Sequence, residues 1–349
     1  MLSLDLRKLM ILQAIIDDYV MTAMPVGSRT VSKHSGLNLS SATIRNEMFD
    51  LKELGLLEQP HTSSGSMPSE KAYRLYVNRL MQKSNLNSDE IEHISKHYSK
   101  KINGVEDVVK QTALVLSQMT NYMSMIITPH LNDAELRRIQ IIPVTDDKAL
   151  LVIVSDVGLL RDAIIKVPSE ISEHELDRIS EMLTNALSGK KLSEISNSYM
   201  PDLFKELGER RESLEFINKL GENLKKASKS TKQEVETYGA KNLLSFPEYS
   251  DIEVAKNLLD ALEQRDMIYA LLSNATDLEF SIKIGSEIED PKLTNCSIVT
   301  ATYSIGGRPL GSMGVLGPTR MNYSRVLAIL SHIGKSLSEI LNQMYLDTD

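Results

Sequence analysis

The residues best suited to specific chemistry stand together in the run Ser40-Ser41-Ala42-Thr43-Ile44-Arg45-Asn46. An arginine can bridge the O6 and N7 acceptors of guanine, and an asparagine can bridge N6 and N7 of adenine. Serine and threonine at a helix start let the backbone approach a phosphate, which the N-terminal dipole attracts. This combination predicts a DNA contact with Arg45 and Asn46 at base edges and with Ser41 and Thr43 near the phosphates.

These side chains act together only if residues 40–55 form a helix. An apolar stripe recurs at intervals of four and three residues and predicts one buried face: Ile44, Met48 and Leu51. Ser40 or Ser41 is the predicted N-cap, and Gly55 is a natural stop. Taken alone, an ordinary amphipathic surface helix explains the pattern equally well, so the neighbouring elements have to decide.

Those neighbours are typical of a winged helix-turn-helix. Apolar spacing predicts a first helix around residues 9–19, and Ser28 starts a short helix that ends near His34. A short helix, a tight turn and a second helix are the helix-turn-helix arrangement. A short strand at 56–59 and a turn-rich stretch at 61–66 then predict a hairpin wing.

Further candidates for contact with DNA lie on three elements. The short helix contributes Ser28, Arg29 and Lys33, and the predicted wing contributes His61, Thr62 and Ser63. The helix after the wing contributes Lys71, Arg74 and Arg79. For each of these cations a solvated surface position explains the charge as well as a phosphate contact does.

The charge distribution agrees with an anion-binding N-terminal part. The whole chain has a net charge of −8, but residues 1–83 hold ten Lys or Arg and eight Asp or Glu. The remainder therefore carries a net charge of −10. A weakly cationic head on an acidic body suggests that anion binding is confined to the head.

Catalytic, metal and membrane functions find little support. His93 and His97 stand four residues apart, as metal ligands on a helix can, but no third ligand accompanies them. An enzyme with an appended DNA-binding head would need a nucleophile and base, or a metal set, within 90–349, and we find neither. Cys296 is the single cysteine, which fits a reducing cytosol. No apolar run reaches the roughly eighteen residues of a membrane span. We expect a cytoplasmic protein without enzyme activity, cofactor, metal or membrane partner.

The body of the chain has an α+β pattern. Strand-like runs occupy 122–167, and Ser172 with Glu175 forms a capping box for a helix to about Leu187. The later elements are predicted at a polar helical stretch 200–235, a helix 251–272, a strand 278–284, a hairpin at Gly306-Gly307 and a helix 322–345. The polar helical stretch looks like an insertion between two β-rich parts.

Residues 25–65, PVGSRTVSKHSGLNLSSATIRNEMFDLKELGLLEQPHTSSG, resemble the head of the bacterial heat-inducible transcription repressors of the HrcA family. A second similarity covers Ile284-Gly285-Ser286-Glu287 and GSMGVLGPTRMNYSRV at 311–326. A weaker one is FPEYSD at 246–251. The resemblance spans nearly the whole chain and keeps the family's order.

The resemblance implies an α+β protein of three domains. These are a winged helix-turn-helix at 1–83, a GAF-like α+β domain at 84–199 and 273–349, and an inserted, mainly helical dimerisation domain at 200–272. It also implies a homodimer that binds an inverted repeat called CIRCE in double-stranded operator DNA and represses heat-shock chaperone operons. A GroEL-type chaperonin is implied to keep the repressor active, and repression is implied to lapse on heat stress.

The sequence departs from the family pattern at one position of the wing, and one alternative function stays open. The family's wing usually reads S-x-G-R-x-P, and Ser66 stands here where the arginine is expected. Loss of one cation at the DNA backbone predicts weaker and less salt-sensitive binding than in relatives. The alternative is a small-ligand-responsive transcriptional regulator with the GAF-like domain as its sensor, although the sequence shows no obvious ligand constellation.

Overall fold

The computed structural model describes residues 4–34, 36, 39–60, 65–82, 84–98, 105–127, 135–155, 158–169, 171–191, 194, 216, 218–224, 235–273, 280–305 and 308–346. The chain divides into two compact units. The first comprises Met1–Ile127, Val235–Tyr303 and Gly311–Leu337. The second comprises Thr128–Glu234, Ser304–Leu310 and Ser338–Asp349.

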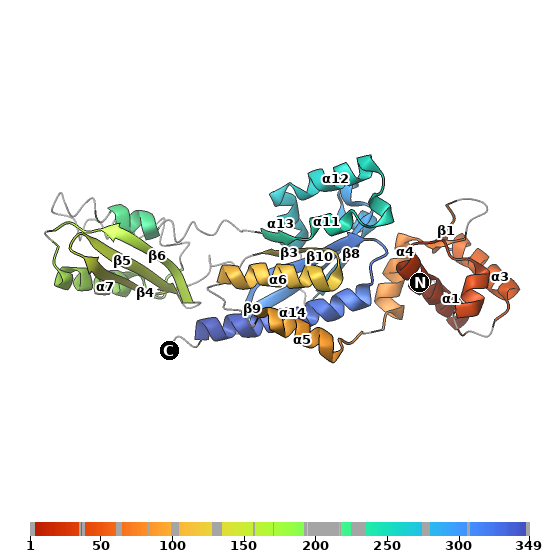
Figure 1. Ribbon diagram of the computed structural model, residues 1–349, viewed down its shortest axis with the longest axis horizontal. Coiled ribbons are helices and arrows are strands. Elements are labelled where there is room, and N and C mark those ends of the chain that lie inside the picture. Colours follow the sequence, from red (N-terminus) through yellow and green to blue (C-terminus); the bar gives the residue numbers. More distant parts are fainter. Residues whose placement is uncertain are drawn as a thin grey trace. The chain divides into compact units, whose positions relative to one another are not determined.

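The first unit begins with the predicted winged helix-turn-helix, which is confirmed (Figure 1). Its elements are α1 Leu6–Thr22, α2 Ser28–His34, α3 Ser41–Glu53, β1 Leu57–Glu58, β2 Met67–Pro68, α4 Glu70–Leu75 and the π-helical turn η1 Tyr76–Leu80. The apolar stripe of α1, from Ile11 to Ile16, is buried together with the stripe of α3. Gly55, at φ +70°, follows the end of α3 in the left-handed conformation that glycine adopts without strain.

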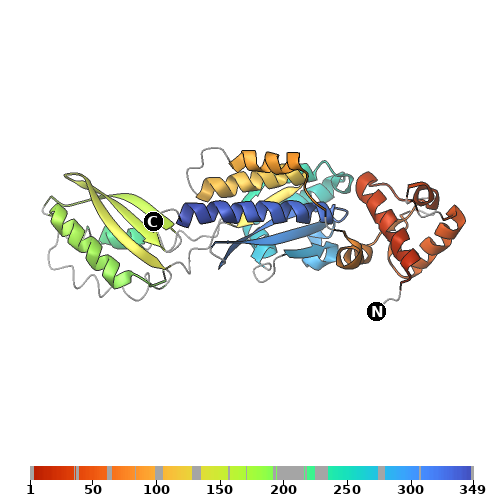
Figure 2. The same ribbon diagram turned by 90° about the horizontal axis from the view of Figure 1, so that it is seen from below.

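A five-stranded sheet in the order β7-β3-β10-β9-β8 forms the rest of the first unit's core. Its strands are β3 Met123–Ile127, β7 Val235–Tyr238, β8 Phe280–Ile284, β9 Cys296–Ile305 and β10 Arg308–Pro318. Helices α11 Ala240–Leu243, α12 Ile252–Leu262 and α13 Arg265–Ser273 lie on one face, and α5 Ser88–Tyr98, α6 Val105–Thr120 and α14 Tyr323–Leu346 on the other (Figures 1 and 2).

Side chains that alternate along β3 explain why helices cover both faces. Met123, Met125 and Ile127 join the buried cluster formed with α11 to α13. Ser124, which points the other way, donates its hydroxyl to the Ala113 carbonyl of α6 at 2.6 Å. Both faces of this sheet are therefore buried, as in many α/β domains.

The second unit contains its own three-stranded antiparallel sheet, β4 Leu136–Thr145, β5 Lys148–Ser155 and β6 Gly158–Lys166. Helix α7, Glu173–Leu187, covers one face and begins with the predicted Ser172–Glu175 capping box, which is confirmed. Buried residues of the strands and of α7 form the core together with the short helical stretch at 218–224.

This division differs from the domain boundaries expected from the sequence. Strands β4 to β6 and α7 were expected in the GAF-like domain, yet they form a separate sheet with its own core. Residues 235–273, expected in a helical insert, pack on the five-stranded sheet instead. The stretch 251–272 is also two helices, α12 and α13, rather than one. Which sheet an apolar face joins depends on its partner, and the pattern along one segment does not contain that information.

Candidate nucleic-acid interface

Helix α3 carries the side chains predicted to meet DNA. Its N-cap is Ser40, whose hydroxyl accepts the Thr43 amide at 3.1 Å and lies 2.9 Å from the Thr43 hydroxyl. The apolar stripe is buried as predicted, with Ile44 and Leu51 at 0% exposure. The cap and the stripe together fix which side of α3 faces outward.

The outward side of α3 contains the predicted base-reading pair. Arg45 and Asn46 are exposed, and neither has a hydrogen-bond or ion-pair partner among the described residues. Ala42 is exposed next to them, and Phe49 is 63% exposed one turn further on. Free guanidinium and amide groups on the first turns of an exposed helix have the geometry that major-groove readout requires.

Two basic residues of α1 hold the acidic side of α3. Lys8 Nζ lies 2.8 Å from Glu47 Oε2 and 3.0 Å from Asp50 Oδ2, and Arg7 Nη1 lies 3.4 Å from Glu47 Oε1. The hydrogen bond to Glu47, followed by that to Asp50, raises the pKa of Lys8 above its usual value. The carboxylates of Glu47 and Asp50 are thereby engaged by cations of α1.

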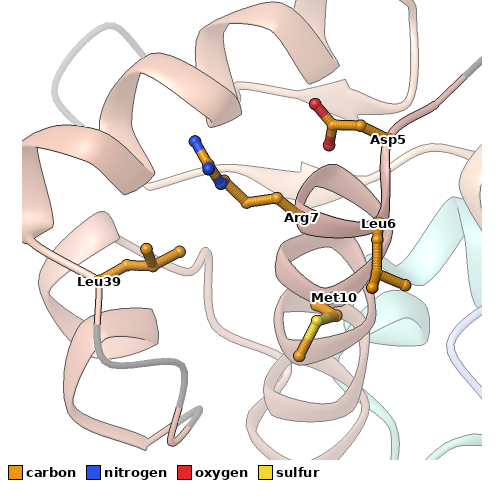
Figure 3. A pocket seen from close by; sticks show the side chains of 5 residues that line it. All are labelled: Asp5, Leu6, Arg7, Met10 and Leu39. Atoms are coloured by element: carbon orange, nitrogen blue, oxygen red, sulfur yellow. The ribbon is translucent and has the colours of Figure 1, made fainter.

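A hollow of about 470 Å³ beside the start of α1 is lined by Asp5, Leu6, Arg7, Met10 and Leu39. Figure 3 shows Leu39, which directly precedes the cap of α3, pointing across this hollow toward the side chains of α1. The Arg7 side chain is 57% exposed. Sequence reasoning missed this cation near the start of α3, because only the fold brings the first turn of α1 to that place.

Helix α2 brings a second polar helix start to the same region. Ser28 Oγ lies 3.3 Å from Ser41 Oγ, so the first residues of α2 and α3 touch. Arg29 and Lys33 are both exposed on α2. The predicted set Ser28, Arg29, Ser40, Ser41, Thr43, Arg45 and Asn46 therefore belongs to two adjoining helices.

The predicted wing contacts His61, Thr62 and Ser63 lie outside the described residues. The described base of the wing is tied to the turn before α2 by two backbone hydrogen bonds between Val26 and Ser66, at 2.8 and 2.9 Å. Ser66 itself is only 1% exposed. An arginine at this position would have to lead its guanidinium outward past its neighbours, and its expected effect on DNA affinity stays a prediction.

Two cations after the wing have partners within the protein. Lys71 Nζ donates to the Leu54 carbonyl at 2.8 Å, which satisfies the C-terminal end of α3. Arg74 pairs with the Glu287 carboxylate and donates to the Ile282 carbonyl at 2.7 Å. The sequence allowed both as phosphate contacts, but these bonds hold them in structural roles. Arg79 remains exposed.

Replacement of Ser40 by alanine tests how the cap positions α3. We expect α3 to lose roughly 1 kcal/mol of stability, because one amide of its first turn loses its acceptor. Backbone amides of α3 in the full chain should exchange with solvent about fivefold faster. Ser172→Ala, which uncaps α7 in the second unit, is the control and should leave the α3 amides unchanged.

Other chemistry finds little support along the described part of the chain. No group of three or more His, Cys, Asp or Glu residues there could hold a metal ion. The rings of His93 and His97 lie 4.7 Å apart edge to face, and His97 Nδ1 contacts the His93 carbonyl. Burial raises the pKa of the Cys296 thiol to about 11, so a reactive thiolate is not populated near neutral pH. Among the described helices, none combines the length and apolar character that crossing a membrane requires.

Two family models match most of the chain. Residues 3–82 match the family model described as "Winged helix-turn-helix transcription repressor, HrcA DNA-binding". Residues 106–327 match the family model described as "HrcA protein C terminal domain". The chain is 40% identical to the heat-inducible transcription repressor HrcA of Ruminiclostridium cellulolyticum over 96% of its length and 97% of the relative. It is 35% identical to that of Moorella thermoacetica over 99% of its length and 100% of the relative.

A solved structure shares the fold. A crystal structure of a hypothetical protein superposes with a TM-score of 0.66 and 25% sequence identity, covering 98% of this chain and 100% of the other. The similarity therefore extends over the winged helix-turn-helix and the α/β part together.

Proposed function

This chain belongs to the HrcA family of heat-inducible transcription repressors, and from that premise we propose that it silences chaperone operons by placing α3 in the major groove of an inverted-repeat operator. One observation carries the proposal: Arg45 and Asn46 are exposed and unpaired within the described residues, on a helix whose opposite side is buried. Such a helix presents base-reading groups in a fixed orientation.

Phosphate contacts complete the proposed docking. The hydroxyls of Ser28, Ser40, Ser41 and Thr43 stand at the starts of α2 and α3, and Arg29 is exposed beside them. Helix starts attract anions through their free amides and dipole. We place Arg7 in the same phosphate-binding group, and His61, Thr62 and Ser63 of the wing are proposed to contact the adjoining backbone or groove.

We also propose that the repressor acts in the cytoplasm as a homodimer that joins through the open face of the sheet β4-β5-β6. An inverted repeat has twofold symmetry, and a dimer with the same symmetry places one α3 on each half-site. The side chains of Ile142, Leu150 and Ile164 lie in one row across the three strands. Ile164 is 66% exposed and Ile142 is 41% exposed, and Val144 beside them is 56% exposed.

The row of Ile142, Leu150 and Ile164 is the reason for proposing that a second copy of this chain covers the open face of the sheet. Helix α7 covers the opposite side of the sheet, and the open side has no cover among the described residues. A contiguous apolar patch on a surface marks an interaction site, and a twofold axis through Leu150 would place each row against its own copy. Polar side chains at Arg138, Asp162 and Lys166 surround the patch, as expected for the rim of an interface.

The helical segment expected to dimerise is occupied elsewhere. Within 200–272, Phe216, Leu220 and Leu224 are buried in the core of the second unit. Leu258 of α12 and Leu272 of α13 are buried in the core of the first unit. These apolar groups are no longer available to a partner, which favours the sheet face instead.

A GroEL-type chaperonin is proposed to maintain the binding-competent dimer. Folded domains are stable by only about 5–15 kcal/mol, and the stability of a dimer depends on the concentration of its partner. Heat that separates the subunits exposes the apolar sheet face of Ile142, Leu150 and Ile164. Exposed apolar surface of this kind is a target for a chaperonin, which returns the chain to the dimeric state.

Footprinting on the DNA upstream of the repressor's own gene tests the proposed function. We expect two protected segments whose centres lie a whole number of turns apart, at roughly 10 base pairs per turn. On heating into the heat-shock range, occupancy should fall at least tenfold and recover when chaperonin is added. Full occupancy at the higher temperature without chaperonin would contradict the proposed heat response, and absence of protected DNA at both temperatures would contradict operator binding.

A second candidate, a ligand-responsive regulator, is favoured by one observation. A hollow of about 730 Å³ lies between the segment after the winged helix and α14. Met81, Leu86, Phe280 and Leu327 provide apolar walls, and His332 and Lys335 are the basic residues that line it. This lining suits a small amphipathic acid. Such an acid would have to change operator affinity at constant temperature for this candidate to stand.

A further inference from the structure

Two C-terminal segments contact the winged helix instead of forming a site of their own. They are 284–287 and 318–324, and they lie in the same compact unit as the winged helix. Sequence separations of more than 200 residues are involved, so these contacts exist only in the folded chain. They fall into two groups, which we call the first and the second anchor.

The first anchor holds α4, the helix that directly follows the wing. Arg74 Nε donates to Glu287 Oε1 at 2.8 Å, its Nη2 pairs with Glu287 Oε2, and the same Nη2 donates to the Ile282 carbonyl. One turn earlier, Glu70 accepts the amide of Ser286 at 3.2 Å and its hydroxyl at 2.6 Å. Arg74 and Glu70 of α4 thus bind two groups of one short turn, Gly285–Ile288: the Glu287 carboxylate and the Ser286 amide.

Gly285 allows this turn to approach α4. It has φ +54°, and a Cβ atom built on it would lie 1.9 Å from Oε1 of Glu70. Any other residue would displace the Glu70 carboxylate and would also strain the backbone. The contact therefore depends on a glycine that adds no charge and no hydrogen bond of its own.

The second anchor holds the end of α1. Arg320, which is 9% exposed, donates to the Val20 carbonyl at 3.0 Å and to Glu248 Oε1 at 2.5 Å. Its guanidinium also lies 5.5 Å from the centre of the Phe246 ring. A buried guanidinium that contacts a carbonyl, a carboxylate and an aromatic ring has few alternative positions, so it holds the last turn of α1 in one place.

Further contacts join the two anchors. The rings of Tyr73 and Tyr323 lie 6.1 Å apart and both are buried, and Ser324 Oγ donates to the Gln82 carbonyl, where the chain leaves the winged helix. The Arg74–Glu287 pair is partly exposed, at 31% and 39%, and one such pair alone would contribute little. Acting together with a buried arginine and an aromatic pair, it restricts rotation of the head in several directions.

We propose that these two anchors form a clamp that sets the orientation of the winged helix, and thereby the half-site spacing that the repressor accepts. Arg74, Glu287 and Arg320 are positioning residues, because none of them belongs to the face that meets DNA. The inference rests on the proposed dimer and its inverted repeat. In that dimer a clamped head cannot turn on the sheet of its own unit, so it accepts fewer half-site separations than a released head does.

The test measures the affinity of the full-length repressor for a series of operators whose central spacer is lengthened by one to five base pairs. Five base pairs turn one half-site by about half a helical turn, so the unaltered chain should lose at least tenfold in affinity. The double variant Glu287→Gln with Arg320→Gln removes the ion pair of the first anchor and the buried guanidinium of the second. Its loss over the same series should be below threefold, while its affinity for a single half-site stays within twofold of the unaltered chain.

Three further variants distinguish a change in the orientation of the winged helix from a change in net charge and from misfolding. Glu92→Gln removes one carboxylate from an exposed pair with Lys96 inside α5 and should leave the spacing profile unchanged. Gly285→Ala alters no charge and should flatten the profile by displacing Glu70. The exchange Arg74→Glu with Glu287→Arg should restore part of the profile that either single change flattens.

Each outcome decides the proposal. A steep spacing profile in the double variant, with half-site affinity intact, overturns the clamp and leaves the proposed function untouched. A flat profile in the unaltered chain overturns the clamp in the same way. If the unaltered chain binds no inverted repeat at all, the proposed function fails and this role of the anchors fails with it. Loss of half-site affinity in the double variant, while Gly285→Ala leaves the profile steep, also overturns the clamp.

Discussion

Replacement of Arg45 by alanine is expected to weaken operator binding by about 1–3 kcal/mol per half-site, which corresponds to roughly 5- to 150-fold. Both subunits carry the change, and energies of separated positions add approximately, so the whole operator should lose about twice that free energy. The reason is that an exposed guanidinium can donate two hydrogen bonds to one guanine, and alanine can donate none. Asn46→Ala should cost a similar amount at a different base pair.

The informative measurement is the dependence on sequence and salt. Affinities of the full chain should be determined for operators with each base pair changed in turn, at several salt concentrations. Arg45→Ala should relax the preference at one position in each half-site. Arg29→Ala, in contrast, should weaken binding to all sequences alike and lower the salt slope by about one unit for each phosphate that is no longer neutralised. Lys256→Ala removes an exposed cation from α12 and controls for net charge.

Uniform weakening of the Arg45→Ala variant on every sequence would contradict base reading by this residue. It would then belong with Arg29 in the phosphate-binding group. A lack of any effect from Arg45→Ala and Asn46→Ala together would remove α3 from the DNA interface, and with it the geometry proposed for the repressor. The unaltered burial of Ile44 and Leu51 should be verified by the unfolding transition of each variant.

Replacement of Ile164 by aspartate is expected to separate the proposed dimer. A charge buried without a partner costs about 3–5 kcal/mol, which corresponds to a dissociation constant higher by roughly two to four orders of magnitude. Twofold symmetry places the change on both sides of the interface, which increases the effect. Sedimentation over a range of concentrations should show dimer for the unaltered chain and monomer for the variant at the same concentration.

Ile252→Asp provides the matched control. Ile252 is 81% exposed at the first position of α12, outside the sheet face, and aspartate is well tolerated at a helix start. This variant should remain dimeric. Ile164→Asp should also bind the operator in two independent steps of half-site affinity. If its mass stays dimeric, the sheet face of Ile142, Leu150 and Ile164 is not the interface.

The two expected results are linked by the proposed clamp. Base reading requires α3 to stand at one angle to the duplex, and dimerisation doubles the free energy only if both heads meet their half-sites together. Lys8 fixes α3 on α1 through Glu47 and Asp50, and Arg320 fixes the far end of α1 through the Val20 carbonyl. A continuous set of contacts thus leads from α3 through α1 to the C-terminal part of the first unit.

Local signals in the sequence were sufficient wherever the structure depends on neighbours a few residues apart. Ser40 as a candidate cap, the stripe from Ile44 to Leu51 and Gly55 as the stop specify α3, and the structure confirms each of them. The Ser172–Glu175 capping box specifies the start of α7 in the same way. Outward placement of Arg45 and Asn46 followed from helical periodicity alone, because burial of one side determines the other.

Only the tertiary structure decided the roles that depend on distant partners. Arg74 has the same charge and a similar setting to Arg79, yet its partner Glu287 stands 213 positions away. Ser66 lies in a polar turn but is buried by its pairing with Val26. The apolar faces of β4 to β6 and of α12 and α13 were visible in the sequence, whereas their assignment to two different cores was not. The physical reason is the same in each case: a side chain's charge and polarity are properties of one residue, but its partner is selected by the packing of the whole chain.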